Sequence, residues 1–198
     1  QARTLILGEF YLQMGPSGYA VMDVYCNHIR GPEDFSSARP GPGKIPNNNV
    51  VNVEHTWPQS RFSRRYSDDT QKTDLHHLFP TDSHINAVRG NHPFGEVNQE
   101  VMQLDCPESR FGVGSAGSDD VFEPPVNHRG NVARALFYFS VRYELPISED
   151  EEAILRKWHK QDPVDEAEHA RNQEIFEIQK TRNPFIDFPD LVDSIQNF

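Results

Sequence analysis

Three residues in this chain have the types that metal-assisted hydrolysis requires. Glu54 adjoins His55 in the segment V-E-H-T-W-P-Q-S, and Asn86 follows in H-I-N-A-V-R. Carboxylate and amide oxygens are ligands that a hard divalent cation such as Mg²⁺ prefers. An imidazole titrates near neutrality and can take a proton from water. A cation beside a base is what phosphodiester hydrolysis needs, so the three residues predict a hydrolytic site.

The adjacency of Glu54 and His55 has a geometric consequence. Neighbouring residues on a regular strand point to opposite faces. Both side chains therefore serve one site only if the strand ends or bulges there. We predict an irregular strand end at this pair. Each residue also has a purely structural interpretation. Glu54 can be a surface carboxylate, His55 a core imidazole, and Asn86 an ordinary helical amide.

Three further histidines raise the alternative of a zinc site. His76, His77 and His84 lie close in sequence, but Pro80 separates them and the two cysteines are distant. A structural zinc site takes four nitrogen or sulfur ligands at short paired spacings. We instead expect one of His76 and His77 to be buried and to orient the site by a hydrogen bond.

A phosphate-binding group is expected to be arginine, because its planar fork matches phosphate oxygens. The candidates are Arg61, Arg64, Arg65 and Arg89. Arg134 and Arg142 fall on an expected core helix, where they have buried acids as alternative partners. The sequence does not rank the four candidates.

The net charge of −11 argues against a polyanionic substrate, but its distribution softens that argument. Residues 39–67 hold five basic residues and one acid, whereas residues 143–198 hold fourteen acids and six bases. A cationic strip beside the site is suited to steering a phosphate backbone. We expect modest affinity and strong salt sensitivity.

The length of 198 residues predicts a single domain over residues 1–198. No apolar run approaches the roughly 20 residues of a membrane span. The chain opens without Met or an apolar leader, so we expect a mature or trimmed form. Cys26 and Cys106 are either two buried thiols or one disulfide that fits an oxidising compartment.

The expected elements describe an α+β domain, mostly helical, with one small β-hairpin. Helices are predicted over residues 4–14, 131–145, 148–161 and 162–181, and strands over 21–26, 50–53 and 74–78. Thr81 or Asp82 can cap a further helix that runs to about Val88. A long surface loop is expected over residues 31–49 and a turn over 182–189. G-V-G-S-A-G at 112–117 matches a dinucleotide-binding pattern, but no helix is expected after it, so we interpret it as a loop.

Four ordered blocks of the chain resemble the endonuclease I family of bacterial secreted and periplasmic nucleases, within the ββα-metal superfamily. The blocks are V-E-H-T-W-P-Q-S at 53–60, D-L-H-H-L-F-P at 74–80 with Asn86, Arg89, Asn91 and P-F-G at 93–95, R-G-N-V-A-R-A-L-F-Y at 129–138, and Q-K-T-R-N-P-F-I-D at 179–187. Together they cover most of the chain.

The resemblance implies a small ββα-metal core, formed by the hairpin and the helix after it. It implies that His55 is the general base and that Glu54 and Asn86 hold one Mg²⁺, with Mn²⁺ as a substitute. It also implies cleavage of DNA, and often RNA, with little sequence preference, leaving 5′-phosphates. A secreted or periplasmic monomer that does not enter a membrane is expected.

Two departures from the family pattern bear on these expectations. Some relatives carry several disulfides and many are basic, whereas this chain has two cysteines and is acidic. The family's phosphate-contacting arginine falls in a stretch of variable length and is not carried over to one position. The alternative function is a non-catalytic nucleic-acid-binding domain of the same fold, which has no need of the base His55.

Overall fold

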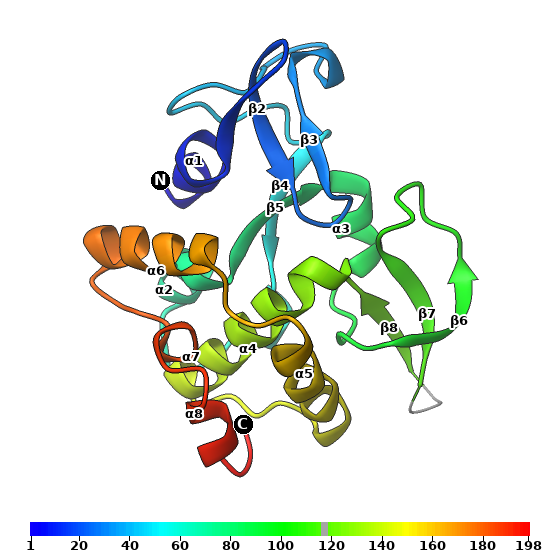
Figure 1. The fold of residues 1–198 in the computed structure, drawn as a ribbon, viewed down its shortest axis with the longest axis vertical. Coiled ribbons are helices and arrows are strands. Elements are labelled where there is room, and N and C mark those ends of the chain that lie inside the picture. The colour runs from blue at the N-terminus through cyan, green and yellow to red at the C-terminus, as the bar shows by residue number, and fades with distance from the viewer. Residues whose placement is uncertain (116–118) are drawn as a thin grey trace.

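The computed structural model describes residues 1–115 and 119–198. Within them, three small antiparallel sheets lie above and to one side of a group of helices that has α4 at its centre (Figure 1). The strands are β1 (Leu12–Gly15), β2 (Gly18–Asp23), β3 (His28–Arg30), β4 (Val51–His55), β5 (Leu78–Asp82), β6 (Val97–Met102), β7 (Arg110–Gly114) and β8 (Asp120–Glu123). They form the sheets β1-β2-β3, β4-β5 and β6-β7-β8. The predicted α+β class is confirmed, whereas the prediction of a single hairpin was wrong.

The helices gather mainly in the second half of the chain. They are α1 (Ala2–Leu5), α2 (Asp68–Lys72), α3 (Ser83–Arg89), α4 (Arg129–Tyr143), α5 (Glu149–Gln161), α6 (Glu166–Gln179), α7 (Pro184–Asp187) and α8 (Leu191–Ser194). A π-helical turn follows α1 at Ile6–Phe10, and 3₁₀ turns lie at Pro32–Asp34, Gln59–Arg61, Leu75–His77 and Val126–His128. None of the described helices is long and apolar enough to cross a membrane.

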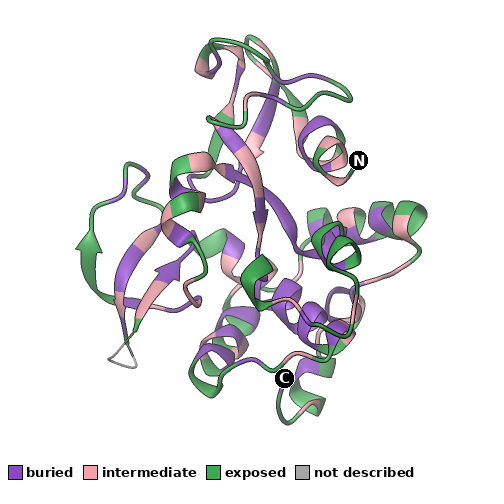
Figure 2. Ribbon diagram, turned by 180° about the vertical axis from the view of Figure 1, so that it is seen from behind, coloured by how far each residue is buried: buried purple, intermediate pink, exposed green. Residues whose placement is uncertain are grey.

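Helix α4 forms the centre of the main core, as its periodic apolar residues predict. Val132, Leu136, Phe139 and Tyr143 are all buried, and Figure 2 shows α4 buried along most of its length. The Trp57 ring stacks on Phe139 with 5.3 Å between ring centroids. This contact attaches the segment just after β4 to the central helix.

Strands β4 and β5 with helix α3 form one continuous unit beside α4 (Figure 1). The strands pair in regular register, with Glu54 opposite Phe79 and His55 opposite Leu78. The Asp82 carboxylate accepts hydrogen bonds from the backbone N–H groups of His84 and Ile85, so it caps α3 as predicted. The helix therefore starts directly from the end of the second strand.

Three predicted elements of the first half were wrong in extent. The strand expected over 21–26 runs from Gly18 to Asp23 as β2. The helix expected over residues 4–14 ends at Phe10, and β1 begins at Leu12 because this segment pairs with β2 across the turn at Gly15–Gly18. The strand expected over 74–78 begins only at Leu78 and runs through Pro80. A two-stranded sheet has edge strands only, where a residue without an N–H is tolerated.

The helices predicted for the C-terminal part of the chain differ from the structure mainly in where they begin. Helix α6 begins at Glu166 and not near Asp162, because the Asp165 carboxylate accepts the Glu168 N–H and caps it there. The helix predicted from Ser148 is confirmed as α5, although the Ser148 side chain makes no capping hydrogen bond. Residues 182–189, expected as a turn, include the short helix α7.

The glycine-rich segment 112–117 begins in a strand and ends beyond the residues that the structure describes. Its first three residues belong to β7, so the loop prediction was wrong there, and residues 116–117 lie outside the described residues. A Cβ on Gly112 would lie 2.1 Å from the Gln99 carbonyl oxygen, so the paired β6 leaves no room for a side chain. The dinucleotide pattern has no counterpart here, because β8 follows and not a helix.

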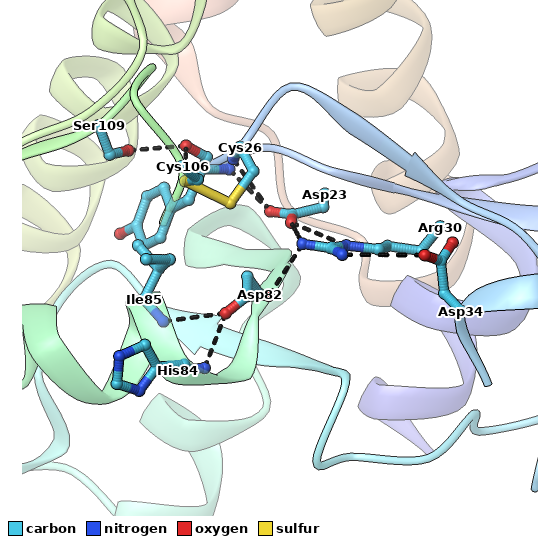
Figure 3. Close-up of a disulfide and its surroundings, with 10 residues drawn as sticks. Asp23, Cys26, Arg30, Asp34, Asp82, His84, Ile85, Cys106 and Ser109 are labelled. Carbon is cyan, nitrogen blue, oxygen red and sulfur yellow. Dashed lines mark hydrogen bonds and ion pairs between the residues drawn. A yellow bond between two sulfur atoms is a disulfide. The ribbon is translucent and has the colours of Figure 1, made fainter. Parts of the chain in front are cut away.

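The two cysteines form a disulfide, which decides between the two interpretations of the sequence. Cys26 follows β2 and Cys106 follows β6, and their Cα atoms lie 5.1 Å apart (Figure 3). The bond joins the first sheet to the segment that leads into β7. Residues 31–49 between β3 and β4 form the expected long connection, with only the 3₁₀ turn Pro32–Asp34 in it.

Candidate active site

The three predicted site residues line one open hollow against β4 and α3. Its lining consists of Val53, Glu54, His55, Pro58, Gln59, Ser60, Asn86, Gly90 and Asn91. The structure therefore brings Glu54, His55 and Asn86 to one place. The strand ends at His55 as predicted, but the predicted irregularity was wrong, because β4 pairs regularly with β5 as far as His55. Glu54 is buried and His55 is partly exposed, as opposite faces of a strand require.

The Glu54 carboxylate is buried and held at one of its two oxygens. Its Oε1 accepts a hydrogen bond from the Tyr25 hydroxyl at 2.9 Å and lies 2.8 Å from Nη1 of Arg89. Burial raises the pKa of Glu54, and the Arg89 charge opposes that rise. The closest contacts of both side chains are to Oε1. A carboxylate held mainly at one oxygen beside a hollow is suited to bind a cation through the other.

The Asn86 amide is oriented by its neighbour on β4. Its Nδ2 donates to Oδ1 of Asn52 at 2.7 Å, and the same Asn52 oxygen accepts from the Thr81 hydroxyl at 3.4 Å. The Asn86 carbonyl oxygen is thus directed away from that contact. An amide oxygen and a carboxylate oxygen at one hollow are a donor set that fits Mg²⁺, which keeps waters in its remaining positions.

The His55 imidazole has one nitrogen bound to the backbone. Its Nε2 lies 3.1 Å from the Lys72 carbonyl oxygen, which only accepts, so Nε2 carries the proton. The Nδ1 atom then holds the lone pair, which receives the Gln59 amide at 3.3 Å. Burial lowers the pKa of His55 to about 4. The ring is therefore neutral at pH 7 and has its basic nitrogen on Nδ1.

His76 and His77 are both buried, which exceeds the expectation for one of the pair. Their Nε2 atoms lie 3.1 Å from the Thr181 carbonyl and 2.8 Å from the Gln71 carbonyl, respectively. The His77 ring packs edge-on against His55 at 5.4 Å between centroids. His77 thus meets His55 by ring packing and not by the hydrogen bond that we expected.

The zinc alternative finds no ligand group among residues 1–115 and 119–198. The one set of three His, Cys, Asp or Glu side chains close enough for a metal there is Asp23, Cys26 and Asp82. The Cys26 sulfur is bonded to Cys106. Nη2 of Arg30 lies 3.2 Å and 2.9 Å from the two carboxylates. A guanidinium already occupies that site (Figure 3), and His84 stays exposed on α3.

The four candidate arginines are not brought together. Arg89 is fully buried and donates to the His55 and Thr56 carbonyls, so it holds the end of β4. Arg61 donates to the carbonyl of Asn91, a residue that lines the hollow, at 2.8 Å, and its Nη1 lies 3.6 Å from a carboxylate oxygen of Glu151. Arg65 pairs with an exposed glutamate, and Arg64 is exposed without a hydrogen bond to any described residue.

The two arginines of α4 have the buried acidic partners that the sequence suggested. Arg134 pairs with Glu168 at 2.5 Å, and Arg142 lies 3.1 Å from Asp74. Both are thereby used within the fold, which separates them from the arginines near the hollow.

Sequence reasoning missed two residues that hold the site. Asn52 stands two positions before Glu54 on a strand, so the alternation of side chains placed both on one face and was an available signal. Tyr25 lies in the connection after β2 and carries no such signal. Its contact with Glu54 depends on how the first sheet packs against β4.

Comparison with known proteins gives consistent matches over this architecture. The family described as Endonuclease I matches residues 13–190, a span that includes all four sequence blocks quoted above. An extracellular ribonuclease of Bacillus subtilis (strain 168) is 36% identical over 162 residues, which cover 73% of this chain and 53% of that protein.

Two further relatives match a shorter part of the chain. Endonuclease-1 of Buchnera aphidicola subsp. Acyrthosiphon pisum (strain APS) is 33% identical over 115 residues, covering 58% of this chain and 44% of its own length. A periplasmic deoxyribonuclease of Aeromonas hydrophila is 30% identical over 122 residues, covering 58% and 47%. The chain spans about half the length of the curated relatives that it matches.

Proposed function

Because this chain belongs to the endonuclease I family, we propose that it is a metal-dependent endonuclease that hydrolyses phosphodiester bonds of DNA and also of RNA. The observation that carries the proposal is the shared hollow lined by Glu54, His55 and Asn86. Relatives named as a ribonuclease and as a deoxyribonuclease support both substrates. The products are proposed to carry 5′-phosphates.

In this proposal β4, β5 and α3 are the ββα-metal core, and Glu54 and Asn86 hold one Mg²⁺, which Mn²⁺ can replace. When bound, the cation supplies positive charge that stabilises the phosphate and the departing 3′ oxygen. The Arg89 charge opposes the rise in the pKa of Glu54 that burial causes, and so favours the ionised carboxylate. Asn52 keeps the Asn86 amide turned so that its oxygen, and not its N–H₂, is available.

His55 is the proposed general base, acting through Nδ1. A water molecule replaces the Gln59 amide at that nitrogen and is held in line with the phosphate. The water oxygen bonds to phosphorus, the proton passes to Nδ1, and the bond from phosphorus to the 3′ oxygen breaks. The hydrogen bond from Nε2 to the Lys72 carbonyl fixes the tautomer that this step needs.

Substrate contacts are proposed to reach the phosphate backbone. Arg64 is the candidate proposed for this role because it is exposed, whereas Arg89 is buried, Arg65 pairs with Glu144 and Arg61 pairs with Glu151. Contacts to phosphate position a nucleic acid without reading its bases, so little sequence preference is expected. Because the charges are exposed, Arg64→Ala should weaken binding a few-fold at low salt and little at high salt.

The test is cleavage of supercoiled plasmid and of RNA, with Mg²⁺ and with EDTA. His55→Ala should lower the rate by about 10²–10⁴-fold, the usual contribution of a general base. The exposed His84→Ala is the matched control and should cut like the wild type. Equal rates for wild type and His55→Ala would show that the base is another residue. Binding of plasmid without cleavage in Mg²⁺ would favour the alternative, a non-catalytic binding domain.

We also propose a secreted or periplasmic location and a monomeric state. The names of the extracellular and periplasmic relatives support the location. The disulfide fits it, because such bonds persist in oxidising compartments. Fractionation of the source cells tests the location, and light scattering of the purified protein tests the monomer.

A further inference from the structure

We infer that Tyr25 is a positioning residue that fixes the cation ligand Glu54 and thereby sets the affinity of the site for its metal. This inference rests on the proposed function, since it concerns the same carboxylate. Tyr25 lies in the connection after β2 and comes from a different sheet than the strand that carries Glu54. Its role is therefore separable from the β4–β5–α3 unit.

The contacts at Glu54 fix the orientation of its carboxylate. The Tyr25 hydroxyl donates to Oε1 at 2.9 Å, and Nη1 of Arg89 approaches the same oxygen at 2.8 Å. Two donors on one oxygen resist rotation of the group about its last bond. Because the closest contacts of both donors are to Oε1, Oε2 is the oxygen that is better placed to serve as the ligand atom.

The two donors do not affect a cation in the same way. The positive charge of Arg89 stabilises the ionised carboxylate but opposes the approach of a second cation. The Tyr25 hydroxyl is neutral and adds a directional contact without that repulsion. Tyr25 thus restricts the carboxylate at a smaller electrostatic cost to metal binding than Arg89, and its loss should appear chiefly as weaker affinity.

Tyr25 is itself held on both sides of its peptide unit. Its N–H donates to Oδ1 of Asp23 at 3.0 Å, and its carbonyl accepts the Ser109 hydroxyl at 2.7 Å. The next residue is joined through the disulfide to Cys106, as Figure 3 shows. The ring packs on Phe122 at 4.7 Å. A side chain anchored this firmly is suited to hold another group in place.

If the Tyr25 hydroxyl only stabilises the fold, its removal should leave the affinity for metal unchanged. Metal binding measured without substrate therefore distinguishes the structural role from the positioning role. Tyr25→Phe removes the hydroxyl and keeps the ring. We expect its Kd for Mn²⁺, measured by titration of the nucleic-acid-free protein with paramagnetic detection of free Mn²⁺, to rise about 10–100-fold, as for other groups that orient metal ligands. At saturating Mn²⁺ the rate of plasmid cleavage should largely recover.

The matched control is Tyr143→Phe. Its hydroxyl donates to a different buried carboxylate, Oδ2 of Asp74, at 2.8 Å. This variant should lose a similar amount of stability to urea and keep the wild-type Kd for Mn²⁺. Equal Kd values for wild type, Tyr25→Phe and Tyr143→Phe would overturn the inference.

Glu54→Ala separates this failure from failure of the proposed function. If Glu54→Ala abolishes Mn²⁺ binding but Tyr25→Phe leaves it unchanged, only the role of Tyr25 is wrong. If the wild type binds no Mn²⁺, or Glu54→Ala binds it normally, the proposed ligand is wrong.

A second measurement needs no substitution and so does not depend on the folding of a variant. In the wild type, the Tyr25 ring resonance should shift on titration with Mg²⁺, and that of Tyr143 should not. Saturation with Mg²⁺ without a shift of the Tyr25 signal would also overturn the inference.

Discussion

Two buried carboxylates, Glu54 and Asp74, have similar partners and different surroundings. Each accepts tyrosine hydroxyls and lies about 3 Å from an arginine nitrogen. The partners of Asp74 are Tyr138, Tyr143 and Arg142 at Oδ2, and the His76 N–H and the Gln179 amide at Oδ1. Both oxygens of Asp74 are therefore used inside the fold. At Glu54 the tyrosine and the arginine share one oxygen, and the group borders an open hollow.

The pKa values of the two groups shift in opposite directions. Burial raises the pKa of Glu54, and Arg89 only partly offsets it. Burial also works to raise the pKa of Asp74, but the neighbouring imidazoles and donated hydrogen bonds outweigh it and lower that pKa. A carboxylate whose two oxygens both accept hydrogen bonds inside the protein stabilises the fold. A carboxylate that is held mainly at one oxygen beside a hollow remains able to bind a cation.

The largest expected effect comes from exchanging each carboxylate for its amide and measuring cleavage. Glu54→Gln should lower kcat/KM by about 10²–10⁴-fold, because a metal contributes several kcal/mol to such a reaction. Asp74→Asn should stay within about threefold of wild type per folded molecule, since it contacts no proposed site residue. Plasmid-nicking rates, normalised to the folded fraction, check both. Similar losses in the two variants would remove the distinction between the two carboxylates.

The two variants should rank in the opposite order when the loss of stability is measured and not the loss of activity. Asp74→Asn should lose about 3 kcal/mol of unfolding free energy, because it breaks charge-assisted hydrogen bonds in a buried network. Glu54→Gln should lose less, since its amide oxygen can still accept from Tyr25. Urea unfolding followed by fluorescence checks the order. A smaller loss for Asp74→Asn than for Glu54→Gln would contradict it.

The third effect is a pH dependence of stability, to which the buried His76 beside Asp74 should contribute. Burial lowers the pKa of His76 from 6.5 to about 4. The unfolded chain therefore binds a proton that the folded protein does not, between those two values. The contribution of His76 is complete above pH 6.5 and is lost as the pH falls towards 4, by up to about 3 kcal/mol. The raised pKa of Glu54 acts in the opposite sense.

His76→Gln provides the check, because its amide can still donate to the Thr181 carbonyl. Urea midpoints measured at pH 7 and near pH 4.5 should differ less in His76→Gln than in the wild type. Equal differences would place the acid sensitivity elsewhere in the molecule.

Parts of this fold with strong local signals could be predicted from the sequence. The periodic apolar residues of 131–145 predicted the central helix, and Asp82 predicted the start of α3, because a cap is a local interaction. The β-branched run before Glu54 predicted β4. These three elements place Glu54, His55 and Asn86, which is why the candidate site could be assembled from the sequence.

The remainder depends on contacts between distant segments. β1 and the strands β6–β8 are short, and their pairing is decided by tertiary packing and not by alternation. The predicted strand 74–78 stopped before Pro80, because the sequence does not reveal that β5 belongs to a two-stranded sheet, where proline is tolerated. The partnership of Tyr25 with Glu54 and the pairing of Cys26 with Cys106 likewise depend on how the sheets meet.

The disulfide makes a closed covalent ring of the chain from Cys26 to Cys106, with a sequence separation of 80. β4, β5 and α3, and with them the whole candidate site, lie inside this ring. The long exposed connection over residues 31–49 lies inside it too. A single protease nick in that connection opens the ring but frees no fragment, because both pieces stay linked through sulfur. Cleavage in this long connection therefore cannot detach the candidate site.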